Sequence, residues 1–240
     1  MNSRETSQMG KTNNDHWEES MDSLYNAEHQ TKVFNRFTSL QALYSIVEGG
    51  KMNFSDPRWW PDRNDSKLLD LYCKKKNISI RVLCLTGDYE TISFWTDYAD
   101  NGNGCCIQFD RKNLLEKLDT LVQADSAVRH RKTTYLKFME TKRFKELQLD
   151  DIPFCKRWPY RYESEYRVIK EFTGYGRTDI SAFMDISVRT DIEKVTLGPN
   201  IDDESYKEIK ADLLRHGVKK VNRSSVLKSN TWFKKFSHLL

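Results

Sequence analysis

The sequence has few cysteines and nothing that would hold it in a membrane. Five cysteines among 240 residues are odd in number and form no Cys-x-x-Cys pair, which argues against a disulfide framework and against a zinc site. No apolar run approaches the length of a transmembrane helix, and Met1–Ser7 lacks the apolar core of a secretory signal. We therefore expect a cytoplasmic protein with reduced thiols, no bound metal and no membrane contact.

The composition is that of a folded chain. Aromatic residues make up 12% and hydrophobic residues 38% of the 240 residues. A chain of 28.4 kDa with this composition is large enough for one large domain with a buried core. Residues 1–30 differ, because they are rich in Asn, Ser, Glu, Asp and His and poor in aliphatic side chains. The expected organisation is a loosely ordered arm over 1–30 and a single domain over 31–240.

Positive charge is mild in total but unevenly distributed. The net charge is +4, whereas eight basic residues gather between Arg129 and Lys145, and Lys156, Arg157 and Arg161 follow. Apolar residues at helical spacing predict a basic helix over Thr133–Leu149. Such a helix could bind the phosphates of a nucleic acid, although a charged helical face is more often simply solvated.

Short β-rich runs alternate with capped helices along the chain. Strands are expected near 33–37, 80–86, 104–109, 163–171 and 194–198. Ser39 can cap a helix that stops at Gly49-Gly50, and Asn64 or Asp65 can cap the next. This pattern predicts an α+β fold with a central split, largely antiparallel sheet flanked by helices.

One predicted strand, Glu163 to Phe172, has side chains suited to catalysis. Alternation along a strand would place Glu163, Glu165 and Arg167 on one face. A held carboxylate stabilises the positive charge that develops on a sugar carbon when a glycosidic bond breaks. The alternative is a solvated strand edge with Glu–Arg pairs, since Glu-x-Glu is a short pattern.

Two further places could bind a nucleotide. Arg36 lies near the end of a predicted strand that faces a helix N-terminus, and both groups favour anions; a surface arginine on an edge strand is the alternative. Trp95 and Tyr98 are three apart, so on a helix they share a face and could stack on a flat ring. Core packing explains the same spacing.

The order of these motifs resembles that of a bacterial and phage family known as domain of unknown function 2971. The matching segments span residues 33 to 225. They are Arg36-Phe37, Phe54-Ser55-Asp56-Pro57 with Trp60 and Asp62, Cys84-Leu85-Thr86, Trp95-Thr96-Asp97-Tyr98-Ala99 with Gly104, Trp158, Glu163-Ser164-Glu165-Tyr166-Arg167, and Val195-Thr196-Leu197-Gly198-Pro199.

That layout is in turn similar to ADP-ribosyltransferase-fold toxins, some of which modify DNA. The resemblance implies NAD as a substrate, held at its phosphates or ribose by Arg36 with Thr38, and its nicotinamide flanked by Trp95 and Tyr98. It implies Glu165 as the catalytic carboxylate and Glu163 as the group that assists the incoming nucleophile. Candidates for substrate contact are Trp60, Asp62, Trp158 and Arg167. Ser93-Phe94-Trp95-Thr96 departs from the Ser-Thr-Ser motif usual in that fold.

The resulting hypothesis is an NAD-dependent ADP-ribosyltransferase that modifies a nucleic acid or protein, as a toxin or in phage–host conflict. It predicts that Arg36, Trp95, Tyr98 and Glu165 line one pocket. Two other functions stay open. One is a metal-dependent nuclease in which Asp56, Asp62, Asp65 and the two glutamates collect Mg²⁺. The other is a non-catalytic sensor or binding module.

Overall fold

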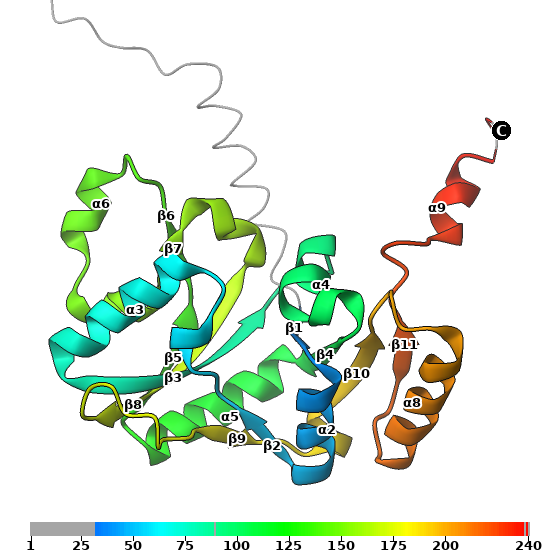
Figure 1. The fold of residues 1–240 in the computed structure, drawn as a ribbon, viewed down its shortest axis with the longest axis horizontal. Helices are drawn as coiled ribbons and strands as arrows, with labels where there is room; N and C mark the ends of the chain where they lie inside the picture. The colour runs from blue at the N-terminus through cyan, green and yellow to red at the C-terminus, as the bar shows by residue number, and fades with distance from the viewer. Residues whose placement is uncertain (1–31, 89, 238, 240) are drawn as a thin grey trace, which may run out of the picture. The chain divides into compact units, whose positions relative to one another are not determined.

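A seven-stranded open sheet organises the computed structural model, which describes residues 32–88, 90–237 and 239 (Figure 1). The predicted arm over 1–30 lies outside the described residues. In sheet order the strands are β11 (Val221–Arg223), β10 (Ile192–Leu197), β4 (Cys105–Asp110), β1 (Val33–Thr38), β3 (Ile78–Thr86), β8 (Glu165–Thr173) and β5 (Val128–Lys132). The neighbours β10 and β11 are parallel, and the other neighbours are antiparallel.

Two small sheets and several helices complete the fold. The strand pairs are β2 (Lys51–Asn53) with β9 (Phe183–Asp185), and β6 (Thr134–Leu136) with β7 (Cys155–Arg157). The α-helices are α2 (Leu40–Gly49), α3 (Arg63–Lys76), α4 (Ile92–Tyr98), α5 (Arg111–Ala124), α6 (Thr141–Glu146), α7 (Val188–Asp191), α8 (Asp203–Arg215) and α9 (Asn230–Lys235). The 3-10 helices are η1 (Pro57–Trp59), η2 (Asp100–Gly102), η3 (Leu149–Phe154) and η4 (Trp158–Glu163).

The predicted α+β class with a largely antiparallel sheet is confirmed, because all five expected strand segments belong to the seven-stranded sheet as β1, β3, β4, β8 and β10. Within the described part of the chain, the helices are all too short or too polar to cross a membrane.

The caps of the first two helices follow the local sequence. Ser39 accepts the amide of Ala42 at the start of α2, and Gly50 ends it in the left-handed region at φ 64°. The cap of α3 is Asp62, which accepts the amides of Asn64 and Asp65. The expectation that Asn64 or Asp65 would be this cap was wrong, because the carboxylate of Asp65 is buried and accepts hydrogen bonds from Arg167.

The sheet has two different faces. Asn35, Thr86 and Glu165 are in register across β1, β3 and β8, and directly paired residues point to the same side. We call this side, covered by α3 and α4, the charged face. The opposite side, which carries Leu83 and Val168, is the apolar face.

The apolar face holds the main core. Its strand residues pack against α2 and α5 and include Phe34, Leu83, Leu85, Ile107, Phe109 and Val168, with Leu43, Ile46, Leu114 and Leu118 from the helices. The charged face has only smaller apolar groups, around Leu69 and Tyr72 of α3 and around Trp95 of α4. Between these two groups lie the buried charges described below.

The basic helix predicted over Thr133–Leu149 is absent. That region contains β6 and the short α6, and Phe138 and Met139, two members of its supposed apolar stripe, are 92% and 86% exposed. The basic run just before it lies on β5, an outer strand that pairs only with β8 among the described strands. Charged side chains on an outer strand discourage pairing with another chain.

Candidate active site

Five charged side chains are buried together on the charged face. Asp65 comes from α3, Lys156 from β7, Glu163 from η4, and Glu165 and Arg167 from β8; each is at most 8% exposed. We call this group the charged cluster. Charges are rarely buried unless they are paired, so the pairing within the cluster determines what each group can do.

Arg167 is the most fully bonded member. Its Nε and Nη2 donate to the two oxygens of Glu165 at 2.9 Å each, and Nη1 donates to Asp65 Oδ1 at 3.1 Å and to the Pro153 carbonyl at 3.0 Å. Nη2 also donates to Asp65 Oδ2. These bonds match the five donors of a guanidinium. Arg167 therefore has no donor left for a substrate.

Glu165 is fixed as an anion by the same contacts. Burial alone would raise its pKa, but the attraction of Arg167 and Lys156 outweighs burial and lowers the pKa to about 2. Its backbone amide donates to the Tyr135 hydroxyl at 2.8 Å. Glu165 is thus held in place by the surrounding side chains and is poorly placed to exchange a proton near neutral pH.

Lys156 supplies a cation among the carboxylates. Its Nζ lies 2.6 Å from Glu163, 3.6 Å from Glu165 and 3.8 Å from Asp65. Burial disfavours the ammonium, yet Glu165 and Glu163 raise its pKa overall. An ammonium thus stands where a divalent cation would be needed to balance three carboxylates.

The residues proposed for Mg²⁺ do not converge elsewhere either. Asp56 pairs with Arg58 and Arg81, and Asp62 caps α3. In the part of the chain that the structure describes, no group of three or more His, Cys, Asp or Glu side chains could hold a metal ion. The arrangement gives the nuclease hypothesis no support.

Glu163 differs from Glu165 in position and in chemistry. β8 begins at Glu165, and Ser164 before it adopts the left-handed region at φ 42°. The expectation that Glu163 and Glu165 share one face of a strand was therefore wrong, because Glu163 ends the 3-10 turn η4. The Ser164 turn nevertheless brings both carboxylates to Lys156.

Glu163 is as buried as the other carboxylates of the cluster, at 4% exposed, but it contacts a half-exposed tyrosine. Its Oε1 accepts from the Tyr98 hydroxyl at 2.7 Å, and its Oε2 accepts from Lys156. Burial raises the pKa of Glu163 despite the attraction of Lys156, and Tyr98 is 40% exposed. Two neighbouring carboxylates with opposite pKa shifts are typical of sites where one acts as a base and the other stays ionised.

Aromatic side chains surround the cluster. The Trp60 ring lies 5.4 Å from the Arg167 guanidinium, and its Nε1 donates to Ser55 Oγ at 3.0 Å. The Tyr160 ring lies 4.9 Å from Lys156 Nζ. Trp158, by contrast, contacts Lys137 and Arg161, with ring distances of 4.4 and 4.8 Å. Trp60 therefore covers the cluster, whereas Trp158 binds cations beside it.

The residues expected to bind the cofactor are divided between the two faces. Arg36 is in register with Ile107 of the apolar core, and Thr38 alternates to the same side. Trp95 is on the charged face but is 2% exposed, packs edge-on against Phe37 at 5.1 Å, and donates to Glu90 at 3.0 Å. Trp95 is therefore a core residue.

The structure thus brings Tyr98 together with Glu163 and Glu165 but does not bring Arg36 to them. The cavity that includes Asp56, Arg58 and Arg81 and the cavity that includes Arg36 and Lys51 are not lined by Glu163 or Glu165. Lys156, Tyr135 and Tyr160 were not among the predicted site residues, and Asp65 was considered only as a helix cap or a Mg²⁺ ligand. Lys156 did carry a sequence signal, as part of the second basic group.

Residues 94–168 match the family model described as Protein of unknown function (DUF2971), which confirms the resemblance predicted from the motifs. This segment contains Tyr98 and four of the five members of the charged cluster. No curated protein and no solved structure matches the chain.

Proposed function

We propose that this chain, in which residues 94–168 match the DUF2971 family model, is an NAD-dependent ADP-ribosyltransferase that acts in the cytoplasm on a nucleic acid or protein. The observation that carries the proposal is the Glu163 carboxylate, held between the Tyr98 hydroxyl and the Lys156 ammonium beside a fully paired Glu165. The same proposal includes an ADP-ribosyltransferase-like fold, with a split central sheet. It also includes a role as a toxin or in phage–host conflict.

The proposed reaction breaks the bond between ribose C1′ and the nicotinamide nitrogen. The electron pair of that bond leaves with nicotinamide, which becomes neutral, and positive charge develops on C1′. An oxygen or nitrogen of the acceptor then bonds to C1′, and its proton passes to Glu163. A carboxylate whose pKa is raised by burial is suited to receive that proton.

The other members of the cluster act through Glu163. Arg167 joins Glu165 of β8 to Asp65 of α3, and Lys156 pairs with both Glu165 and Glu163 and so orients the Glu163 carboxylate. This assignment moves the catalytic role from Glu165 to Glu163, because Glu165 already accepts two bonds from Arg167. Tyr98 keeps its proposed contact with nicotinamide, since it is exposed next to Glu163.

The phosphates of NAD require a cation other than Arg36 in this scheme. Arg157, which caps the start of η4, and Arg161, within η4, are both exposed, and we assign the phosphates to them. Trp60 and Trp158 are the aromatic candidates for contact with the acceptor.

The test compares two glutamine variants with wild type. Glu163→Gln keeps the side-chain shape but cannot accept a proton, so nicotinamide release should fall by about 10²–10³. NAD affinity should change little, and the free energy of unfolding should change by less than about 1 kcal/mol. Burial already disfavours the ionised form of Glu163, and glutamine keeps one oxygen to accept from Lys156 while its amide can donate to the Tyr98 hydroxyl. Release of nicotinamide and mass spectrometry of added ADP-ribose, with DNA, RNA and protein acceptors, provide the measurement.

Glu165→Gln is the matched control. It removes an anion from between Arg167 and Lys156, so it should lower stability as well as turnover. Loss of turnover in both variants with stability lost only in Glu165→Gln supports the assignment. Absence of nicotinamide release from wild type with every acceptor, together with no binding of NAD, would exclude the transferase.

A binding module is the second candidate. It is favoured by the saturation of Arg167 and Glu165, which is what a purely structural support would show. In that case NAD should not raise the melting temperature of wild type, because only a ligand that binds the folded state does so. The same measurement on Glu163→Gln should then also show no effect.

A further inference from the structure

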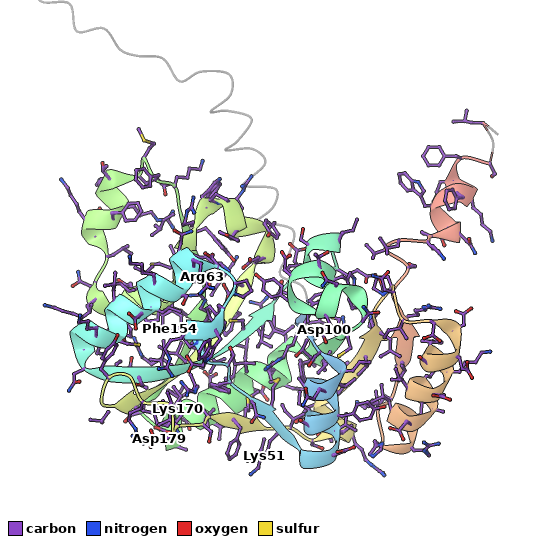
Figure 2. The ribbon with its side chains drawn as sticks, viewed as in Figure 1. Lys51, Arg63, Asp100, Phe154, Lys170 and Asp179 are labelled. Atoms are coloured by element: carbon purple, nitrogen blue, oxygen red, sulfur yellow. The ribbon has the colours of Figure 1, made fainter. Side chains whose placement is uncertain are left out.

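We propose that Arg36 anchors a second ligand site, a small cavity on the apolar face that binds a phosphate group. This site is independent of the proposed transferase centre. It lies on the other side of the sheet from Glu165, and Figure 2 labels Lys51, one of its lining residues, beside α2 and away from Arg63 and Phe154.

The cavity has a volume of about 220 Å³ and is formed by β1, α2 and β2. Its lining residues are Arg36, Ser39, Gln41, Ala42, Ser45, Ile46, Lys51 and Asn53. Two are cations, none is an acid, and most of the rest carry polar side chains. We call it the Arg36 cavity.

The guanidinium of Arg36 is incompletely bonded. Its Nη2 donates to the Asn53 carbonyl at 3.0 Å. Its Nη1 is buried and has no hydrogen-bond partner within residues 32–88, 90–237 and 239. A buried donor without a partner costs free energy, so this atom is explained most simply by a ligand that accepts from it.

The charge of Arg36 is also unbalanced. Burial lowers its pKa only to about 10, so it is a cation at neutral pH. Ion pairs in the described part of the chain do not include it. The groups that act to raise its pKa are the thiols of Cys84 and Cys105, whose own pKa values are raised by burial, so they are neutral. Arg167 on the charged face, by comparison, is matched by two carboxylates.

The surrounding groups suit an anion. Ser39 accepts the Ala42 amide through Oγ, which leaves its hydroxyl hydrogen to donate into the cavity. The first turn of α2 contains no acidic residue, so the positive end of its dipole is not offset. Lys51 adds a second cation, with its Nζ 4.1 Å from the Phe183 ring centre.

The size of the cavity limits the ligand. Sites for drug-sized molecules usually occupy about 300–1,000 Å³, so the Arg36 cavity suits a single phosphate group more than a whole nucleotide. The forked donors of arginine match the oxygens of phosphate. The ligand is therefore inorganic phosphate or a phosphate group on a larger molecule.

The experiment measures phosphate binding directly. Inorganic phosphate is titrated into the full chain at constant ionic strength, with chloride as the balancing anion, by calorimetry and by melting temperature. Wild type should bind and should melt at a temperature that rises with phosphate concentration. Arg36→Gln should weaken binding at least about tenfold, and Arg36→Lys should weaken it less, because the charge is kept but the fork is lost.

Two controls decide between specific binding and general charge effects. Lys112→Gln removes an exposed cation of α5 and should leave binding unchanged, whereas Lys51→Gln should weaken it and serves also if Arg36→Gln does not fold. A nucleoside monophosphate is titrated in parallel. If it binds more tightly than inorganic phosphate, the natural ligand is a phosphate group on a larger molecule; if it binds more weakly, the ligand is free phosphate. Glu163→Gln should bind phosphate as wild type does, whether or not the transferase proposal holds.

Two results would overturn the site. One is a wild-type melting temperature that does not depend on phosphate. The other is phosphate binding that survives Arg36→Gln and Lys51→Gln together.

Discussion

The two faces of the sheet bury their side chains to a similar degree but by different means. On the apolar face, aliphatic and aromatic residues of β1, β3, β4 and β8 pack against α2 and α5. On the charged face, three carboxylates and two cations occupy the space between β8 and α3. The first arrangement is what hydrophobic burial alone would give.

The second arrangement is harder to explain by stability. Replacing a buried ion pair or triad by apolar residues often leaves stability unchanged or raises it. The charged cluster therefore indicates a requirement beyond folding. The match of residues 94–168 to the family model, which includes Lys156, Glu163, Glu165 and Arg167, is consistent with that view.

The largest expected effect on stability comes from removing Arg167, the central cation of the charged cluster. Arg167→Met would leave Asp65 and Glu165 buried without their main partner, so the free energy of unfolding should fall by about 3–5 kcal/mol. The measurement is equilibrium unfolding in urea. Adding Asp65→Asn and Glu165→Gln to Arg167→Met should recover most of the loss, because the remaining charges, Glu163 and Lys156, balance.

The matched change on the apolar face is Phe34→Ala. Phe34 is 1% exposed, and its truncation should also cost about 3–5 kcal/mol. Substitution of charged residues on the other face should not recover that loss, since the cavity it leaves is apolar. If the triple variant is no more stable than Arg167→Met, the two faces fail in the same way and the distinction is wrong.

A smaller effect is expected from acid, and it separates the carboxylates within the cluster. The pKa of Glu165 falls from 4.5 to about 2 on folding, so its contribution is present above pH 4.5 and is lost as the pH falls toward 2. By linkage the loss is at most about 3 kcal/mol. For Glu163 and Asp65 the folded pKa is raised, so their protonation in acid favours the folded state.

Urea unfolding at several pH values between 6 and 2 would test this. Glu165→Gln should make stability less dependent on pH in this range, and Glu163→Gln should make the acid loss steeper. If instead Glu163→Gln made stability less dependent on pH and Glu165→Gln made the acid loss steeper, Glu163 would be the carboxylate whose pKa is lowered on folding.

The smallest effect is expected outside both faces. Phe138 is large and apolar but 92% exposed, so Phe138→Ser should change the free energy of unfolding by less than about 0.5 kcal/mol. A change above 1 kcal/mol in a urea titration would show that Phe138 belongs to a packed group after all.

Much of the sheet could be predicted from the sequence, because β1, β3, β4, β8 and β10 carry runs of β-branched and aromatic residues. β5 could not, since its basic residues on an outer strand look like a polar helical surface. The spacing of Tyr135 and Phe138 added to that impression, although only contacts far along the chain determine which of them is buried.

The candidate site was predicted only in part. Glu163 and Glu165 were expected to lie together, and both contact Lys156, but the turn at Ser164 between them has a left-handed backbone that serine seldom adopts. Arg36 was expected to share a pocket with Glu165, but a single residue decides the face of a strand: Asn35 points to the charged face and Arg36 to the other. Asp65 was considered only as a helix cap or a metal ligand.

The bond between Arg167 and Asp65 has a consequence for the order in which the protein folds. These residues are 102 positions apart, so they meet only after β8 has joined the sheet and α3 has docked on it. Contacts of such long range form late when a chain folds. Weakening this bond should therefore accelerate unfolding more than it slows folding, and the charged cluster would act chiefly by lengthening the lifetime of the native state.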